Sequence, residues 1–174
     1  AIGKDLGNLS MFKDMGITYI TLCHNGSNDI CDSAKGEPEH NGLSPFGRKV
    51  VKEMNRLGII IDISHTSVKT VQDVLELSTA PIIASHSSSR ALCDHPRNLT
   101  DDQIKAIAAK GGVVQVCLYN WFLNKQPNPT ILDAVAHINH IVQLVGIDHV
   151  GIGTDFDGDD TEKLIGCRAA NEVI

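Results

Sequence analysis

The chain has 174 residues, of which 42% are hydrophobic and 21% are charged, and its formal net charge at pH 7 is −6. This size favours one domain, and the composition is that of a globular protein rather than a disordered one. The negative charge argues against general binding of nucleic acid or anionic membranes, and no apolar run reaches the ~20 residues needed to span a bilayer.

Elements of two kinds alternate along the chain. Five short apolar runs lack strict alternation, as expected of parallel strands covered on both faces; they are residues 17–22, 58–64, 81–85, 113–118 and 149–154. Helical patterns precede or separate them, one with Thr100 as an N-cap and Gln103 three residues later; they are residues 6–15, 44–57, 67–77, 100–110 and 129–145. The order predicts an α/β fold.

Five parallel strands fit either an open doubly wound sheet or part of a (β/α)₈ barrel. The first strand ends in LCHNG, without the glycine-rich turn of a dinucleotide-binding fold, so the barrel is the better interpretation. Residues 1–174 are therefore predicted to form a single partial barrel domain. The connection 25–42 is unusually long and polar for a βα loop, which makes it a candidate functional loop.

The five cysteines are odd in number and show no C-x-x-C spacing, and a chain of this size needs no disulfide framework. We expect Cys93 and Cys117 to pack as small apolar side chains, which favours a reducing compartment such as the cytoplasm. Export is left open because the first residue is Ala1 rather than Met. A nucleophilic Cys23 beside His24 is the weaker interpretation.

Chemistry in parallel α/β proteins gathers at the carboxyl ends of the strands. Here those ends carry three histidines and an aspartate: His24, His65, His86 and Asp155. Imidazole is a zinc ligand, and neighbouring strands lie about 4.8 Å apart, so His65 and His86 can share one ion. Zinc needs three or four ligands, and the remaining ones must come from elsewhere.

Other interpretations of these segments compete. A serine nucleophile in SHSSSR would need an elbow such as G-x-S-x-G, which is missing, whereas a phosphate loop made of the three serines and Arg90 stays open. Arg97 is either a surface residue or a planar clamp for a carboxylate. His40 and His95 are expected to be solvated loop residues. His137 and His140, three apart on a helix, could capture a metal weakly, but a structural role is the better interpretation.

Four stretches of the chain resemble the membrane (renal) dipeptidase family of zinc peptidases, in the right order and spacing. They are residues 61–65 (IDISH), 85–88 (SHSS), 97–98 (RN) and 153–158 (GTDFDG). The resemblance covers almost the whole chain. It implies a (β/α)₈ barrel of the metal-dependent hydrolase type that holds two zinc ions and cleaves dipeptides.

The resemblance also implies roles for five residues. His65 and His86 match ligands of the second zinc, and His24 matches the histidine that contacts the substrate and polarises the scissile carbonyl. Arg97 matches the arginine that binds the substrate's terminal carboxylate. Asp155 matches the aspartate that transfers the proton, with Asp157 on the same segment as the alternative.

The sequence departs from the family pattern on one side of the site. The family's His-x-Asp pair on the first strand and its bridging glutamate are not found, so the resemblance covers about strands 4–8. We therefore expect a C-terminal part of a dipeptidase that is inactive by itself. Another amidohydrolase acting on a carboxylate-bearing N-acyl or cyclic amide, and a non-catalytic module, are the alternatives. A homodimer is left open.

Overall fold

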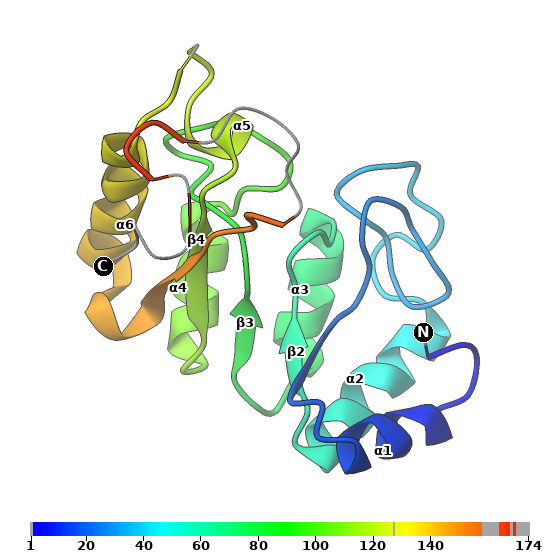
Figure 1. The fold of residues 1–174 in the computed structure, drawn as a ribbon. Helices are drawn as coiled ribbons and strands as arrows, with labels where there is room; N and C mark the ends of the chain where they lie inside the picture. The colour runs from blue at the N-terminus through cyan, green and yellow to red at the C-terminus, as the bar shows by residue number, and fades with distance from the viewer. Residues whose placement is uncertain (1, 127, 158–163, 168, 170–174) are drawn as a thin grey trace. The chain divides into compact units, whose positions relative to one another are not determined.

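The computed structural model of the protein describes residues 2–126, 128–157, 164–167 and 169. Helices and strands alternate along the chain (Figure 1). The helices are α1 (Gly7–Asp14), α2 (Pro45–Leu57), α3 (Val68–Leu77), α4 (Asp101–Ala109), α5 (Asn120–Leu123) and α6 (Ile131–Val145), with a 3-10 helix η1 (Ile147–His149). The strands are β1 (Tyr19–Thr21), β2 (Ile60–Asp62), β3 (Ile82–Ala84), β4 (Val113–Cys117) and β5 (Val150–Gly153).

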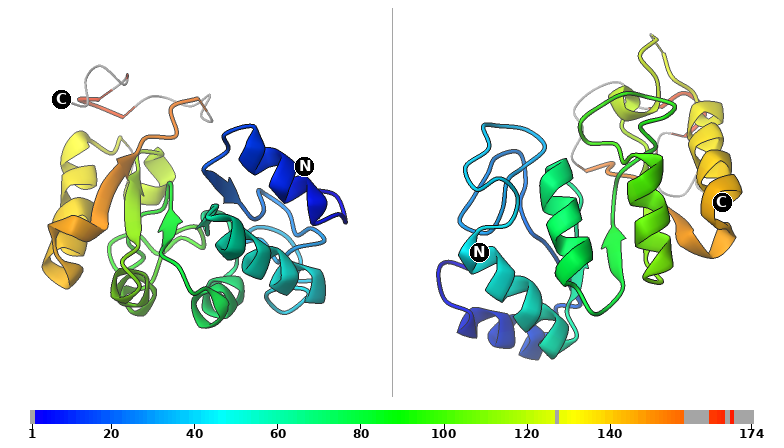
Figure 2. Two further views of the ribbon diagram at one scale, coloured as in Figure 1. Left: turned by 90° about the horizontal axis from the view of Figure 1, so that it is seen from below. Right: turned by 180° about the vertical axis from the view of Figure 1, so that it is seen from behind.

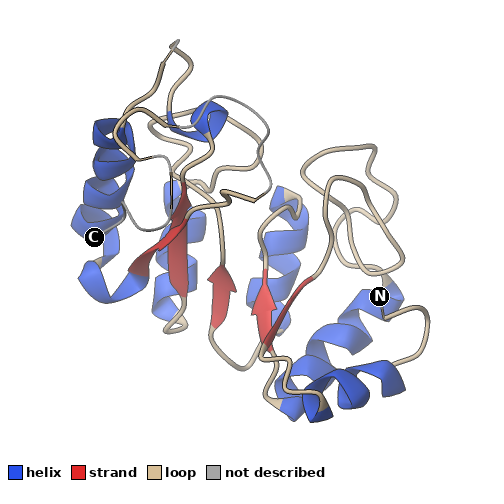
Figure 3. Cartoon of the chain, viewed as in Figure 1, coloured by secondary structure: helices blue, strands red, loops and turns tan. Residues whose placement is uncertain are grey.

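The strands belong to one sheet of order β1-β2-β3-β4-β5, drawn as red arrows in Figure 3. The pairings β1–β2, β2–β3 and β4–β5 are all parallel, with Ile20 opposite Ile61 and Val116 opposite Ile152. The predicted α/β class with five parallel strands is therefore confirmed. Five such strands are also what a part of a (β/α)₈ barrel would present.

The chain divides into two compact units, Ala1–Ile83 and Ala84–Ile174, and the division falls inside β3. In the first unit α2 packs against α1, α3 and β2 (Figure 2). In the second unit α4 packs against α6 and β4, and α6 also covers β5. The prediction that residues 1–174 form a single domain stays a prediction.

Each unit contains buried apolar side chains, most of them aliphatic, as expected of parallel strands that are covered on both faces. In the first unit the fully buried set includes Val50, Met54, Ile61, Val71, Val74 and Ile82. In the second unit it includes Ile104, Ile107, Val114, Val116 and Ile141. These residues lie on the apolar stripes and runs that the sequence predicted.

The helix ends follow the local signals in the sequence. Ser44 caps α2 by accepting a hydrogen bond from the Gly47 amide at 2.8 Å, and Gly58 ends the helix with a left-handed φ of +66°. Thr100 and Gln103 form the predicted capping box at α4. The strands are shorter than predicted, and neither α5 nor η1 was expected. Among the described residues no helix is long and apolar enough to cross a membrane.

Candidate active site

Two of the predicted site residues are in contact in the first unit. The rings of His24 and His65 lie with their centroids 4.2 Å apart and their planes tilted by 32°. His24 follows β1 and is exposed, whereas His65 follows β2 and is buried. His65 adopts a left-handed φ of +70°, which is unusual for a residue with a Cβ. The carboxyl ends of two adjacent parallel strands thus bring two imidazoles together.

The long loop after β1 holds the backbone of both histidines. The Ser33 hydroxyl lies 2.6 Å from the His24 carbonyl oxygen and 3.2 Å from the His65 carbonyl oxygen, with donor geometry to both. The Ala34 amide donates to the same His65 oxygen at 2.7 Å, and the Cys23 thiol contacts it at 3.7 Å. The candidate functional loop, residues 25–42, therefore holds the main-chain carbonyl groups of His24 and His65 in place.

A buried carboxylate organises that loop. Asp32, which is 1% exposed, accepts hydrogen bonds from the amides of Glu39, His40 and Gly42 at 2.7 to 3.0 Å. Burial by itself would raise the pKa of Asp32, but these three amide donors outweigh it and hold the pKa below its usual value. His40 is half-buried and its Nε2 lies 2.8 Å from the Asn28 carbonyl, so this loop histidine is only partly solvated.

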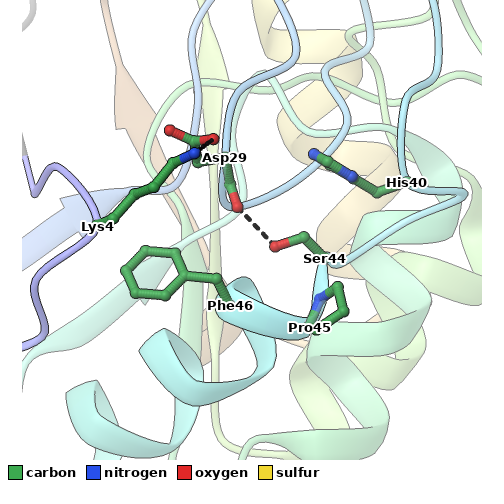
Figure 4. A pocket seen from close by; sticks show the side chains of 6 residues that line it. All are labelled: Lys4, Asp29, His40, Ser44, Pro45 and Phe46. Carbon is green, nitrogen blue, oxygen red and sulfur yellow. Dashed lines mark hydrogen bonds and ion pairs between the residues drawn. The ribbon is translucent and has the colours of Figure 1, made fainter.

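An open pocket of about 300 Å³ lies in the first unit at the start of α2 (Figure 4). Its lining consists of Lys4, Asp29, His40, Ser44, Pro45 and Phe46. The polar groups in it already bond to one another: Lys4 pairs with Asp29 at 3.1 Å, and the Ser44 hydroxyl donates to the Asp29 carbonyl at 2.6 Å. No residue predicted for the active site lines this pocket.

In the second unit the structure brings His86 and Arg97 together. An Arg97 guanidinium nitrogen donates to the His86 carbonyl oxygen at 3.2 Å, and another lies 3.5 Å from the Ser87 hydroxyl. The guanidinium carbon lies 5.3 Å from the ring centroid of Phe122. Arg97 is only 4% exposed, so the surface interpretation is wrong. The His86 ring Nδ1 is 2.7 Å from the Ser85 hydroxyl, which fixes the orientation of the ring.

Asp155 follows β5 and also adopts a left-handed conformation, with φ of +58°. Its Oδ2 lies 3.8 Å from the thiol sulfur of Cys117, at the end of β4. Cys117 is fully buried, and that burial raises its pKa to about 12, so the thiol is a neutral donor. Asp157 is exposed, and Gly158, the last residue of the GTDFDG segment, lies outside the described residues.

Ser87, Ser88 and Ser89, which follow β3, are 1%, 0% and 0% exposed. This burial contradicts a phosphate-binding loop that is accessible to solvent. The Ser88 hydroxyl donates to the Cys117 carbonyl at 3.2 Å, and the Ser89 amide donates to His137 Nδ1 at 3.0 Å. His137 Nε2 lies 3.0 Å from the Leu123 carbonyl, so this ring is neutral with both nitrogens engaged. Burial also lowers the pKa of His137. Its structural interpretation is thus confirmed.

The other secondary predictions about side chains have mixed outcomes. All five cysteines are free and buried, as expected for Cys93 and Cys117. His140 pairs with Asp101 at 2.8 Å. His95 is half-buried and its ring lies 4.6 Å from that of Phe122, so this loop histidine is only partly solvated.

The donor chemistry of the predicted metal ligands fits zinc, since His65 and His86 both offer imidazole. Two imidazoles are fewer than the three or four ligands that a zinc site needs. Within the described part of the chain, no group of three or more His, Cys, Asp or Glu side chains could hold a metal ion.

Sequence reasoning missed three residues that contact the predicted ones: Ser33, Cys117 as a neighbour of Asp155, and Phe122. Cys117 lies 38 residues from Asp155, and Ser33 lies 32 residues from His65 and nine from His24, so no helical or strand spacing could reveal these contacts. The only available signal was the unusual length of the 25–42 loop, which contains Ser33.

The sequence model of the membrane dipeptidase family, peptidase family M19, matches residues 1–164. The chain belongs to this family. Dipeptidase tcpJ of Claviceps purpurea is 42% identical over 159 residues, which are 90% of this chain and 37% of the relative. An uncharacterized dipeptidase of Schizosaccharomyces pombe is 46% identical over 155 residues, 87% of this chain and 38% of the relative. The chain thus spans less than two fifths of the length of these M19 relatives.

Solved M19-like structures share the fold. The probable dipeptidase PvdM from Pseudomonas aeruginosa superposes with a TM-score of 0.92 at 29% identity, over 99% of this chain and 58% of that chain. A metallo peptidase from Rhodobacter sphaeroides, liganded with a phosphinate mimic of the dipeptide L-Ala-D-Ala, gives a TM-score of 0.89 at 31% identity. That match covers 99% of this chain and 51% of the other.

Proposed function

We propose that this M19 chain contributes to a zinc-dependent dipeptidase, in which an activated water attacks the peptide carbonyl. The observation that carries the proposal is the buried guanidinium of Arg97. A cation that is 4% exposed, with its central carbon over the Phe122 ring and its nitrogens beside the His86 carbonyl and the Ser87 hydroxyl, has the restricted position that two-pronged carboxylate binding needs.

The terminal carboxylate of a dipeptide lies one residue beyond the scissile bond. Binding that carboxylate at Arg97 would therefore fix the distance from the site of recognition to the site of cleavage, and would exclude longer peptides. The phosphinate mimic of L-Ala-D-Ala bound by the Rhodobacter sphaeroides relative supports the same substrate class for this chain.

We assign the remaining roles by the family match. His65 and His86 would hold zinc, with further ligands from residues outside the described set; two ions are expected in the intact site. Zinc, when bound, makes a water acidic enough to be deprotonated at neutral pH. Asp155 would accept the proton of the attacking water and deliver it to the leaving amine. His24 would donate a hydrogen bond to the developing oxyanion, a contribution of roughly 3–4 kcal/mol.

A dipeptide panel and a zinc determination on the full-length protein test the proposal together. We expect about two zinc ions per chain after dialysis, and hydrolysis of L-Ala-L-Ala or L-Ala-D-Ala but little hydrolysis of the corresponding amides. The 174-residue chain alone should retain less than one zinc and hydrolyse no dipeptide.

Two outcomes would contradict the proposal. Equal turnover of dipeptide and dipeptide amide would remove the role of Arg97. Faster hydrolysis of N-acetyl amino acids than of dipeptides would identify another amidohydrolase, whose substrate also carries a carboxylate.

A further inference from the structure

We infer that Ser33 is a positioning residue of the active site, which sets the orientation of the His24 and His65 imidazoles through their backbone carbonyls. The inference rests on the proposed function in placing those two histidines at the site. It assigns a purpose to the long loop after β1, which otherwise offers no catalytic side chain.

The Ser33 hydroxyl has the contacts that such a role requires. It is 2.6 Å from the His24 carbonyl oxygen and 3.2 Å from the His65 carbonyl oxygen, and it accepts a hydrogen bond from the Lys35 amide at 3.1 Å. A hydroxyl carries one proton and two lone pairs, so its donor capacity serves the two carbonyls and its acceptor capacity serves the loop. The side chain is 6% exposed, so water competes little for these bonds.

The backbone of His65 needs such support. A non-glycine residue at φ of +70° is strained and persists only where the surroundings fix it. Besides Ser33, the Ala34 amide and the Cys23 thiol contact the same carbonyl, and an antiparallel bridge joins Ser33 to Thr66. The loop thus fixes a conformation that the chain would otherwise leave.

The two histidines are coupled by this arrangement. Their rings contact at 4.2 Å, and one hydroxyl lies between their two carbonyls. Loss of the hydroxyl removes a contact shared by both carbonyls, whereas the Ala34 amide and the Cys23 thiol stay on the His65 carbonyl, so both imidazoles should respond to this one change. Residues that orient a metal ligand or substrate contact in this way typically change metal affinity or activity by about 10–100-fold when removed.

Ser27 supplies a matched control from the same loop. Its hydroxyl accepts from the Ser33 amide at 3.2 Å and donates to the Glu37 carbonyl at 2.9 Å, so its removal loosens the loop without touching either histidine carbonyl. Comparison of Ser33→Ala with Ser27→Ala therefore separates positioning of the histidines from general support of the loop.

The experiment uses the full-length protein and three readouts: imidazole ¹H–¹⁵N chemical shifts, zinc retained against a chelator, and kcat/KM on a dipeptide. In Ser33→Ala we expect the His24 and His65 signals to move together, and zinc retention and kcat/KM to fall about 10–100-fold. Ser27→Ala should leave those signals in place and change the other two readouts less than about threefold. Ser33→Thr, which keeps the hydroxyl, should restore most of the loss, and Ser33→Cys, nearly isosteric, should be intermediate.

The outcomes separate this inference from the proposed function. Equal effects of Ser33→Ala and Ser27→Ala on the imidazole signals would overturn the positioning role. If the wild-type protein neither binds zinc nor hydrolyses dipeptides, the proposed function fails, and the imidazole signals still decide whether Ser33 orients the two rings.

Discussion

The two units hold their predicted site residues in different ways. In the first unit, hydrogen bonds from the loop end on backbone carbonyls of His24 and His65, and the imidazoles touch each other. In the second unit the side chains themselves are held, since Ser85 contacts the His86 ring and the Phe122 ring lies against the Arg97 guanidinium. The first arrangement fixes the backbone of a residue, and the second fixes the position of its side-chain functional group.

This difference predicts how each region responds to substitution. A side chain held by direct contacts loses its function when its own atoms change, so single substitutions in the second unit should have large effects on substrate turnover. A residue held through its backbone depends on many loop contacts, so most single loop substitutions should have smaller effects; Ser33→Ala is the exception, because its hydroxyl contacts the carbonyls of both histidines. The following experiments test that order.

The largest effect is expected for Asp155→Asn. An amide cannot accept the proton from the attacking water, so kcat of the full-length enzyme should fall by roughly 10²–10⁴-fold. Asp157→Asn is the matched control, because Asp157 follows the same strand and is exposed. A large loss in Asp157→Asn with near-normal activity in Asp155→Asn would transfer the proton-transfer role to Asp157.

Arg97→Lys should have the second largest effect on activity. Lysine keeps the positive charge but cannot offer two parallel donors or stack on the Phe122 ring. We expect kcat/KM for a dipeptide to fall about 100-fold, by analogy with losses at other buried charged contacts. A dipeptide amide should be a poor substrate for both proteins, and an equal loss on acid and amide would mean that Arg97 serves the fold rather than the carboxylate.

Phe122→Leu should have a smaller effect that depends on Arg97. Without the ring the guanidinium loses its stacking partner, so KM should rise about fivefold to tenfold with little change in kcat. In an Arg97→Lys background the same substitution should add almost nothing, because the two residues act as one unit. Fully additive effects would show that Phe122 acts by itself.

The smallest effect concerns pH and the loop of the first unit. The pKa of Asp32 is lowered in the folded protein, so its stabilising contribution is present above the unfolded value of about 4 and is lost as pH falls through the lower folded pKa. Asp32→Asn should cost about 1 kcal/mol of unfolding free energy at pH 7. The difference from wild type, measured by denaturant unfolding, should shrink below pH 4; a constant difference would contradict the charge-based account.

The regular elements were accessible from sequence because their signals are local. The stripe of Val50, Val51 and Met54 predicts α2, and the Thr100–Gln103 pair predicts the start of α4; both elements formed as expected. The four-residue α5 has too few turns to show periodicity, so it was not predicted. Strand ends were overestimated because the apolar runs continue past the last ladder hydrogen bond.

The site could be predicted only in part from the sequence, for a physical reason. Histidines after strands indicate a site because parallel strands end at one edge, and this rule places His24 beside His65. Arg97 contacts Phe122, 25 residues away, and the Cys117–Asp155 contact joins the end of β4 to the segment after β5. Such contacts are set by packing and leave no periodic pattern in the sequence.

Gly153, at the end of β5, shows how little freedom this edge of the second unit has. A Cβ built at that position would lie 1.9 Å from the carbonyl oxygen of Ser85, a backbone atom that cannot rotate away. In a saturation mutagenesis library, position 153 should therefore tolerate no replacement, alanine included, even though it carries no functional group. In a map of mutational fitness, position 153 would resemble a catalytic residue. The cause of its intolerance would be the short distance between the main chains of Gly153 and Ser85.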